Sequence, residues 1–425
     1  MKKRLGLAWL AGAALLGLCE GSAGAAPTLR VQVTQEGDFA LIGNTLGHEC
    51  RKSTPSPVVG TIGACATTDD TSTLHDSAPD IFWRAGSPSE GRAEADIAIT
   101  MDQARSAAAL ELPEGATVTH AFLYWSARNA AGVDGTATLD REGGFNEELS
   151  ALTSWEVTVN KGTPDESHVY QSVADVTQIV RDHGVGEYRV SGVDVSPIVD
   201  TDDARTYVGW WMVILYKAEG LPPRNLAVFD GLDRVSRSNP QVLELDGVAV
   251  PDGGFDAKLG VVAFEGDHNI SGDRLFINPS SSSPSADEAL GDAQSPADNF
   301  FNGTRSFLGA PVSVDGDLPQ LTGTPQSLPG IDIDVVDVTA RLTSGMTSVP
   351  VLATSDETGD EADLYFIGGW VTSIGSASGL YPTGSGVFLC AAVPGDRAPG
   401  AGWLLGATAF GALGAIAGLR RSRRR

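Results

Sequence analysis

Short runs of β-branched and aromatic residues, bounded by glycine, proline, aspartate and asparagine, recur along most of this 425-residue chain. Such runs are typical of β-strands that are separated by turns. A helical pattern is confined to residues 93–110 and to the short segment 173–182. The clearest strands are predicted at residues 29–34, 117–127, 188–195, 208–216, 226–229, 259–264, 349–354 and 364–374. The sequence therefore predicts an all-β fold.

An internal repeat indicates that the β region has two related parts. Asp175-Val176-Thr177 precedes Trp210 by 35 residues, and Asp337-Val338-Thr339 precedes Trp370 by 33. Each aspartate is expected to cap the turn that follows it, because its carboxylate accepts hydrogen bonds from exposed N–H groups. We expect two tandem, jelly-roll-like β-sandwich domains at residues 26–219 and 220–378, joined at the Gly/Pro-rich stretch 218–224.

The first 25 residues have the pattern of a signal peptide. Three basic residues at positions 2–4 precede an apolar run at 5–18, and small residues fill positions 21–25. Cleavage is expected after Ala25. Leu16-Gly17-Leu18-Cys19 is superficially similar to a lipobox, but Leu18 stands where a small residue is normal, so the sequence favours ordinary cleavage over an N-terminal lipid anchor.

The last 25 residues combine an apolar run with a basic terminus. Residues 401–419 contain no charge, and about 20 apolar residues suffice to span a membrane. The arginines that follow would stay on the cytoplasmic side, and they are Arg420, Arg421, Arg423, Arg424 and Arg425. We expect a transmembrane or sorting helix at 401–425 after a linker at 379–400; a buried core helix is the alternative.

Residues 393–425 resemble the C-terminal protein-sorting tails of Gram-negative bacteria, of the PEP type and the myxobacterial type. Val393-Pro394-Gly395-Asp396 is similar to the Val-Pro-Glu-Pro signature but lacks its glutamate and second proline, and Cys390 lies further upstream than the cysteine of the myxobacterial type. The resemblance implies delivery to the cell envelope, with a membrane and a sorting protease as partners.

The region between the two terminal segments is strongly acidic. Without the eight basic residues of those segments and Glu20, the chain keeps 21 basic and 53 acidic residues, a net charge near −32. Such a surface repels phosphate backbones, so nucleic acid is excluded as a partner. Solvation of an extracellular surface is the favoured explanation; Ca²⁺ is the one cofactor that the acids could hold.

Three cysteines remain after signal removal. Cys50 and Cys65 flank a short loop that contains Pro55, Pro57 and Gly60, and an exported chain meets an oxidising compartment, so we expect these two to form a disulfide. Cys390 could be free, pair between chains or belong to the sorting region.

Candidate binding chemistry is confined to acidic turns. Asp267 and Asp273 lie in one Gly-containing turn region, and Asp356 and Asp360 lie in another; these four are the candidate Ca²⁺ ligands. Neither turn has EF-hand spacing, and solvated loop acids are the favoured explanation. The aromatic residues could stack sugars if exposed, but their place in apolar strands favours core positions for Tyr124, Trp125, Trp210, Trp211 and Trp370.

Catalytic motifs are lacking in the sequence. It contains neither a Gly-x-Ser-x-Gly nor a His-Glu-x-x-His motif, and paired carboxylates are too common here to identify a glycosidase. No catalytic residue is assigned, and the chain is expected not to be an enzyme.

Several motifs between residues 117 and 374 resemble a widespread family of bacterial surface proteins. They include Asp175-Val176-Thr177, Leu221-Pro222-Pro223-Arg224-Asn225-Leu226 and Phe229-Asp230-Gly231-Leu232 in the first part of that stretch. Glu265-Gly266-Asp267, Gly272-Asp273, Asp298-Asn299-Phe300-Phe301-Asn302 and Asp332-Ile333-Asp334 follow. The resemblance implies a surface β-protein, often the leading module of an adhesin-like chain. It brings no catalytic residues.

These observations together predict an exported, noncatalytic protein of the cell envelope of a Gram-negative-type bacterium. Adhesion, recognition or envelope structure is the expected role, with a surface protein or a glycan as the partner. A Ca²⁺-dependent carbohydrate-binding protein is the alternative.

Overall fold

The computed structural model describes residues 25–66, 79–86, 93–163, 166–196, 206–313, 321–355 and 364–376. Most of the regular structure of these residues is β-strand. The helices are α1 (Thr177–His183) and the 3₁₀ helices η1 (Met101–Gln103), η2 (Ala286–Glu288) and η3 (Thr339–Arg341), and turns and loops connect the elements. The all-β prediction is confirmed, and each of the eight predicted strands overlaps a strand, although the one predicted at 188–195 ends at Ser191. The helical expectation for residues 93–110 is wrong, since β6 (Ala93–Ala95), η1 and β7 (Arg105–Leu110) occupy that stretch.

The largest sheet has eleven strands in the order β11-β12-β8-β14-β1-β15-β23-β17-β21-β19-β20. Their bounds are β1 (Ala25–Thr45), β8 (Thr117–Asn129), β11 (Thr153–Val159), β12 (Ser167–Asp175), β14 (Val208–Lys217), β15 (Pro223–Val235), β17 (Phe255–Phe264), β19 (Arg305–Phe307), β20 (Ala310–Pro311), β21 (Ile331–Asp337) and β23 (Tyr365–Ser376).

The long strand β1 divides this sheet into two half-sheets that face each other. Its residues from Gly37 to Thr45 pair with β14, and its earlier residues pair with β15. Glycines let the two half-sheets approach closely: a Cβ on Gly43 of β1 would lie 2.6 Å from Ile333 of β21, and one on Gly369 of β23 would lie 2.6 Å from the Trp211 ring of β14. We call the β14 side the first half-sheet and the β15 side the second.

A smaller sheet covers the outer face of each half-sheet. On the first, the order β10-β9-β13-β7-β5-β2-β3 holds β10 (Phe145–Ser150), β9 (Thr136–Arg141), β13 (Gly186–Ser191), β7, β5 (Ile81–Ala85), β2 (Gly47–Arg51) and β3 (Thr54–Ser56), with β4 (Thr61–Ile62) paired to β6 beside it. On the second, the order β16-β22-β18 holds β16 (Gln241–Asp246), β22 (Ser348–Ser355) and β18 (Asp273–Ile277).

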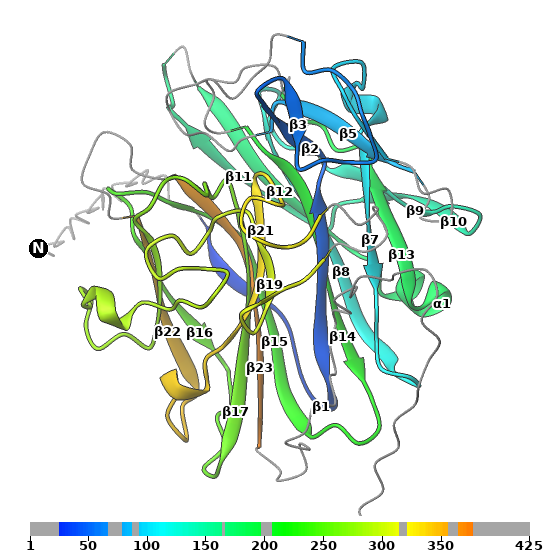
Figure 1. Cartoon of the computed structure of the whole chain (residues 1–425). Coiled ribbons are helices and arrows are strands. Elements are labelled where there is room, and N and C mark those ends of the chain that lie inside the picture. Colours follow the sequence, from blue (N-terminus) through cyan, green and yellow to red (C-terminus); the bar gives the residue numbers. More distant parts are fainter. Residues whose placement is uncertain are drawn as a thin grey trace, which may run out of the picture. The chain divides into compact units, whose positions relative to one another are not determined.

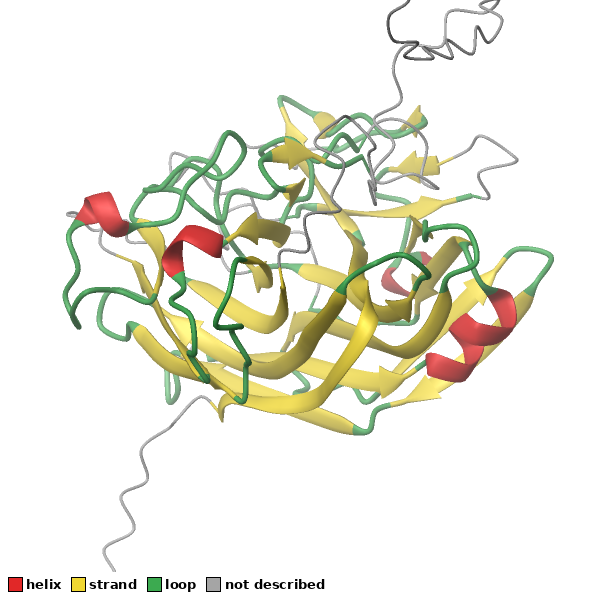
Figure 2. Ribbon diagram, turned by 90° about the horizontal axis from the view of Figure 1, so that it is seen from below, coloured by secondary structure: helices red, strands yellow, loops and turns green. Residues whose placement is uncertain are grey.

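Packing shows the resulting order of four layers. The Trp210 indole donates a hydrogen bond to Ser106 Oγ of β7 at 2.8 Å, which joins the first half-sheet to its cover. Along β17, Leu259 and Val261 pack toward β16 and β22, whereas Val262 and Phe264 pack toward the first half-sheet. Because successive side chains of a strand point to opposite faces, β17 contributes to the core on each side of the second half-sheet. Figure 1 shows the layers from β22 on the left to β9 on the right, and Figure 2 shows the broad curved sheet from another side.

The sequence repeat corresponds to a structural repeat. Strands β12, β8 and β14 of the first half-sheet are matched by β21, β17 and β23 of the second. The Thr177 hydroxyl accepts a hydrogen bond from Ala121 N at 2.9 Å, and the Thr339 hydroxyl accepts one from Ala257 N at 2.9 Å. Asp175 and Asp337 accept hydrogen bonds from the N–H groups of these two threonines at 2.9 and 2.8 Å, which confirms both caps.

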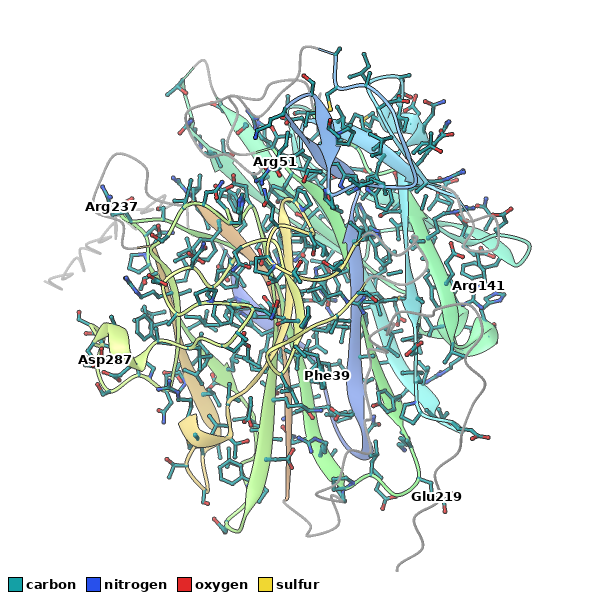
Figure 3. The ribbon with its side chains drawn as sticks, viewed as in Figure 1. Phe39, Arg51, Arg141, Glu219, Arg237 and Asp287 are labelled. Carbon is teal, nitrogen blue, oxygen red and sulfur yellow. A yellow bond between two sulfur atoms is a disulfide. The ribbon has the colours of Figure 1, made fainter. Side chains whose placement is uncertain are left out.

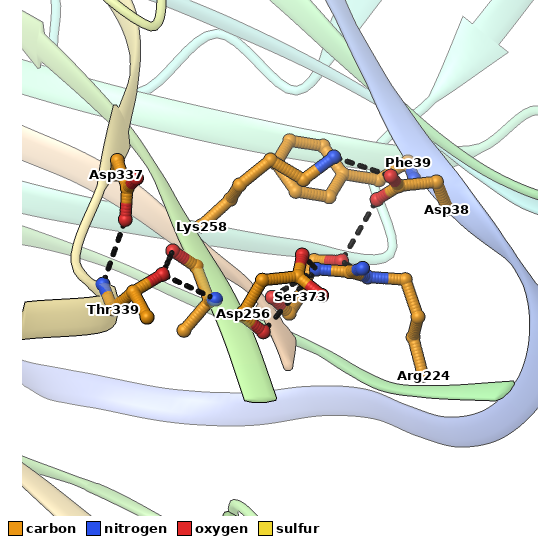
Figure 4. A network of polar contacts seen from close by, with 9 residues as sticks. Asp38, Phe39, Arg224, Asp256, Lys258, Asp337, Thr339 and Ser373 are labelled. Carbon is orange, nitrogen blue, oxygen red and sulfur yellow. Dashed lines mark hydrogen bonds and ion pairs between the residues drawn. The ribbon is translucent and has the colours of Figure 1, made fainter. Parts of the chain in front are cut away.

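The two halves also share a polar network, drawn in Figure 4. Asp38 of β1 forms an ion pair with Lys258 of β17 and accepts a hydrogen bond from Ser373 Oγ of β23 at 2.8 Å. The buried Arg224 guanidinium donates to Ser373 Oγ and to Asp256, both at 2.6 Å. The boundary expected at residues 219/220 falls in the turn between β14 and β15, and the sheet continues across it. The division into two tandem domains stays a prediction.

Candidate functional site

Four buried carboxylates gather at one end of the second half-sheet. Asp332 and Asp334 lie on β21, Asp273 begins β18, and Asp267 lies in the turn between β17 and β18. None of the four side chains is more than 4 % exposed. The expectation of solvated loop acids is therefore wrong for Asp267 and Asp273, since both are buried, and Phe301 N donates a hydrogen bond to Asp273. We call these four residues the carboxylate cluster.

Asp332 is held by a turn of backbone N–H groups. Its Oδ1 accepts hydrogen bonds from the N–H groups of Asn302 and Gly303 at 2.9 Å and of Thr304 at 3.0 Å. Convergent N–H groups of this kind favour the ionised form of a carboxylate. Asp334 is bound differently, by the hydroxyls of Ser306 at 2.6 Å and Thr304 at 3.2 Å.

The cluster also contains oxygen atoms that accept no hydrogen bond from the described residues. Asp273 Oδ2 accepts one from Phe301 N at 2.6 Å, while Asp273 Oδ1, Asp332 Oδ2 and the amide oxygen of Asn302 accept none. A Cβ on Gly266 would lie 2.8 Å from Asp332 Oδ2 and 2.5 Å from the carbonyl oxygen of Phe301. These two oxygens therefore both pack closely against Gly266.

Burial and mutual repulsion make it unfavourable for several carboxylates of the cluster to be ionised at the same time. Burial raises the pKa of Asp273 to about 7, with the Asp267 charge adding to the effect and the backbone N–H groups opposing it. The pKa of Asp332 is likewise raised to about 8, by burial first and by the Asp273 charge, while the backbone N–H groups of residues 302–304 oppose the rise. The pKa of Asp334 is also raised, by burial first and then by Asp332. When ionised, these carboxylates repel one another, and a bound proton or cation would reduce that repulsion.

The disulfide-linked segment contacts the loops beside this cluster. Cys50 and Cys65 are bonded and buried, with their Cα atoms 5.8 Å apart, which confirms the predicted pair. Arg51, labelled in Figure 3, lies with its Nη2 3.0 Å from His268 Nε2. Gln326 Nε2 donates a hydrogen bond to Glu49 Oε2 at 3.0 Å. These contacts join the segment from the first half to the loops of the second.

The other sequence candidates have mixed outcomes. Asp356, Asp360, Cys390, the linker, the five tail arginines and residues 1–24 lie outside the described residues. The aromatic residues are core residues as predicted, since the side chains of Tyr124, Trp125, Trp210, Trp211 and Trp370 are all 0 % exposed.

Sequence reasoning missed the two carboxylates of β21 as site residues. The available signal was the run Ile331-Asp332-Ile333-Asp334-Val335, which places acids within an apolar strand. An unpaired acid in a buried strand is costly, so this pattern marks positions that need partners.

Two features are absent from the described part of the chain. No described helix has the length and apolar character to cross a membrane. Among the described residues, no three His, Cys, Asp or Glu side chains form by themselves an arrangement that could hold a metal ion. Any cation at the carboxylate cluster would need neutral oxygen ligands as well.

A surface hollow of about 280 Å³ lies in the second half. It is bordered by the edge strand β16, where the side chain of Val242 is 70 % exposed, together with Arg237, Phe276 and Pro284.

No protein-family model matches the chain, and no curated protein is significantly similar to it.

Proposed function

We propose that this chain is an exported, noncatalytic protein of the bacterial cell surface that serves adhesion, recognition or envelope structure. The observation that carries the proposal is the buried Cys50–Cys65 disulfide in a chain that begins with a signal-peptide pattern. Disulfides persist in oxidising compartments, which an exported protein enters. In this proposal the β region forms the displayed part, and residues 401–425 form the transmembrane or sorting helix.

Fractionation of cells tests the membrane part of the proposal. Deletion of residues 401–425 should move the protein from the membrane fraction to the periplasm or the medium, because the apolar run and its arginines are removed. Replacement of the five arginines by serine, with the apolar run intact, is the matched control for orientation. A truncated protein that stays with membranes as fully as the intact chain would contradict the anchor.

Protease treatment of intact cells tests surface display. An exposed protein should be cut under conditions that leave a periplasmic marker intact. Full protection of the chain while an outer-membrane marker is cleaved would contradict display at the surface.

Ca²⁺-dependent carbohydrate binding is the second candidate, and the carboxylate cluster is the observation that favours it. The five large aromatic residues named above are buried, so sugar stacking would need other side chains. A glycan-array signal that chelator abolishes would support this candidate. Turnover that is lost on a single Asp or Glu substitution would instead indicate a hydrolase.

A further inference from the structure

We propose that the carboxylate cluster is a Ca²⁺ site, in which Asp273 Oδ1 and Asp332 Oδ2 are the charged ligands and the Phe301 carbonyl and Asn302 amide oxygens are candidate neutral ligands. The inference does not rest on the surface role. It would fail without affecting that role, whereas the carbohydrate candidate would lose its support.

The first argument is that the two oxygens of each carboxylate differ in their hydrogen bonds. Asp332 uses Oδ1 for three backbone N–H groups, and Asp273 uses Oδ2 for one, so each keeps its second oxygen free of hydrogen bonds from the described residues. Both side chains are 0 % exposed. Leaving a buried carboxylate oxygen unpaired costs free energy, and a cation would remove that cost.

The second argument is the close packing of two of these oxygens against Gly266. Even a methyl group there would come within 2.5 Å of the Phe301 carbonyl oxygen and 2.8 Å of Asp332 Oδ2. Only glycine allows both oxygens to lie this close to the chain at residue 266. The Asn302 amide oxygen, which also accepts no hydrogen bond from the described part of the chain, belongs to the turn that holds Asp332.

The choice of ion follows from charge and ligand type. Two carboxylates balance one divalent cation, and all the candidate ligands are oxygens. Ca²⁺ accepts six to eight oxygens in irregular geometry, including carbonyls and waters, whereas Mg²⁺ needs a near-ideal octahedron and loses its water reluctantly. Because neutral oxygens can complete the shell, two carboxylates suffice. The bound ion would fasten the loops at 265–272 and 299–306 to β21.

Calorimetric titration of the full chain with CaCl₂, after treatment with chelator, tests the site directly. We expect saturable binding of one Ca²⁺ per chain. At a free concentration one hundred times the Kd, the melting temperature should rise on the order of 4 °C for a unit of this size. Mg²⁺ at the same ionic strength should give less than a quarter of that shift.

Variants connect the response to the cluster. Asp273→Asn and Asp332→Asn should each weaken Ca²⁺ binding at least tenfold, and the double variant should abolish the thermal shift. Asp134→Asn is the matched control, because Asp134 is a buried carboxylate of the first half whose two oxygens already accept hydrogen bonds from Thr136 N and Asp194 N. That variant should keep the full Ca²⁺ response.

Hydrogen exchange of the unmodified chain gives a second measurement if the variants do not fold. Ca²⁺ should slow amide exchange at residues 265–273 and 299–306, with no change at residues 129–136. Absence of saturable binding in the calorimeter, or slowed exchange elsewhere but not in these two loops, would overturn the proposal.

Discussion

The two halves of the molecule share a strand arrangement but differ in the side chains at one corresponding place. Counted back from the caps Asp175 and Asp337, Tyr170 and Ser172 of β12 stand where Asp332 and Asp334 stand on β21. The first half therefore fills these positions with an aromatic residue and a small hydroxyl, and the second fills them with two buried carboxylates.

At these two positions the first half satisfies its polar groups internally. The Tyr170 hydroxyl donates to the Asp194 carbonyl at 2.6 Å, and Ser172 Oγ donates to the Asp134 carbonyl at 2.6 Å. The second half leaves one oxygen of Asp273 and one of Asp332 without a described donor. Since the same strand arrangement forms without carboxylates in the first half, the scaffold does not require them in the second. The Ca²⁺ site proposed above would give the oxygens without a described donor a role that the strand arrangement alone does not require.

The largest expected effect tests whether the halves unfold together. Trp210 and Trp370 occupy matching strands and are both 0 % exposed. Trp210→Ala and Trp370→Ala should each cost about 3–5 kcal/mol, the usual loss for a large core aromatic residue. Because both strands belong to one sheet, each variant should shift a single unfolding transition in urea, followed by circular dichroism and by fluorescence.

The exposed Val242 offers a control for these tryptophan variants. Val242→Ala should change the free energy of unfolding by no more than about 0.5 kcal/mol. Two separate transitions in Trp370→Ala, with the first half still folded, would show that the halves are independent domains and would break the comparison.

The disulfide is a feature of the first half alone among the described residues. Cys50→Ser combined with Cys65→Ser should cost about 3 kcal/mol, because the bond closes a short loop in the unfolded chain. The urea midpoint measures this loss. Nonreducing peptide mapping of the unmodified chain should find Cys50 with Cys65, and a peptide that links either one to Cys390 would contradict the assignment.

Much of the strand pattern could be predicted from the sequence, but the folding-over of the main sheet could not. Residues 29–34 were predicted as a strand, whereas β1 extends to Thr45 through Gly37, Asp38, Gly43 and Asn44, which resemble turn residues. Glycine is required at position 37, because a Cβ there would lie 1.9 Å from the Tyr216 carbonyl oxygen of β14. A sequence pattern predicts a turn at such a glycine, whereas the close packing of neighbouring strands explains why it lies within a strand.

The candidate site was predictable only in part, for a similar reason. The turn acids Asp267 and Asp273 were identified by ligand type, but their burial depends on loops that are distant in sequence. Asp332 joins them through β21, which the predicted strands did not include. Side-chain chemistry can be predicted from a sequence, whereas convergence of three segments requires the fold.

A pH comparison should show the cost of an unpaired acid in the second half. Asp233 of β15 is 1 % exposed, neither of its oxygens accepts a hydrogen bond from the described residues, and burial raises its pKa to about 7. The folded state therefore binds a proton more tightly than the unfolded state, whose pKa is about 4. Stability should fall as the pH rises from about 4 to 7.

Substitution of Asp233 isolates that effect. Asp233→Asn should be more stable than the unmodified chain by about 1–3 kcal/mol at pH 8, the cost of a buried group without a partner, and should differ little at pH 4. Asp134→Asn, in the first half, should instead lower stability at pH 8. Chemical denaturation at both pH values measures the difference, and an equal response of Asp233→Asn at pH 4 and pH 8 would rule out the ionised carboxylate as its source.

The smallest expected effect concerns Thr177 and Thr339, the two threonines whose hydrogen bonds match between the halves. Thr177 and Thr339 each place a hydroxyl between the N–H and the carbonyl of one residue, Ala121 or Ala257, on the adjacent strand. Thr177→Ala and Thr339→Ala should each cost about 1 kcal/mol, because each leaves one backbone N–H without its hydroxyl partner. Thr→Ser at either position keeps the hydroxyl and should restore most of the loss. Since the two sites share no described partners, the double variant should be additive within about 0.5 kcal/mol in urea denaturation. A cost at one threonine more than twice that at the other would mean that the matching geometry conceals different roles in the two halves.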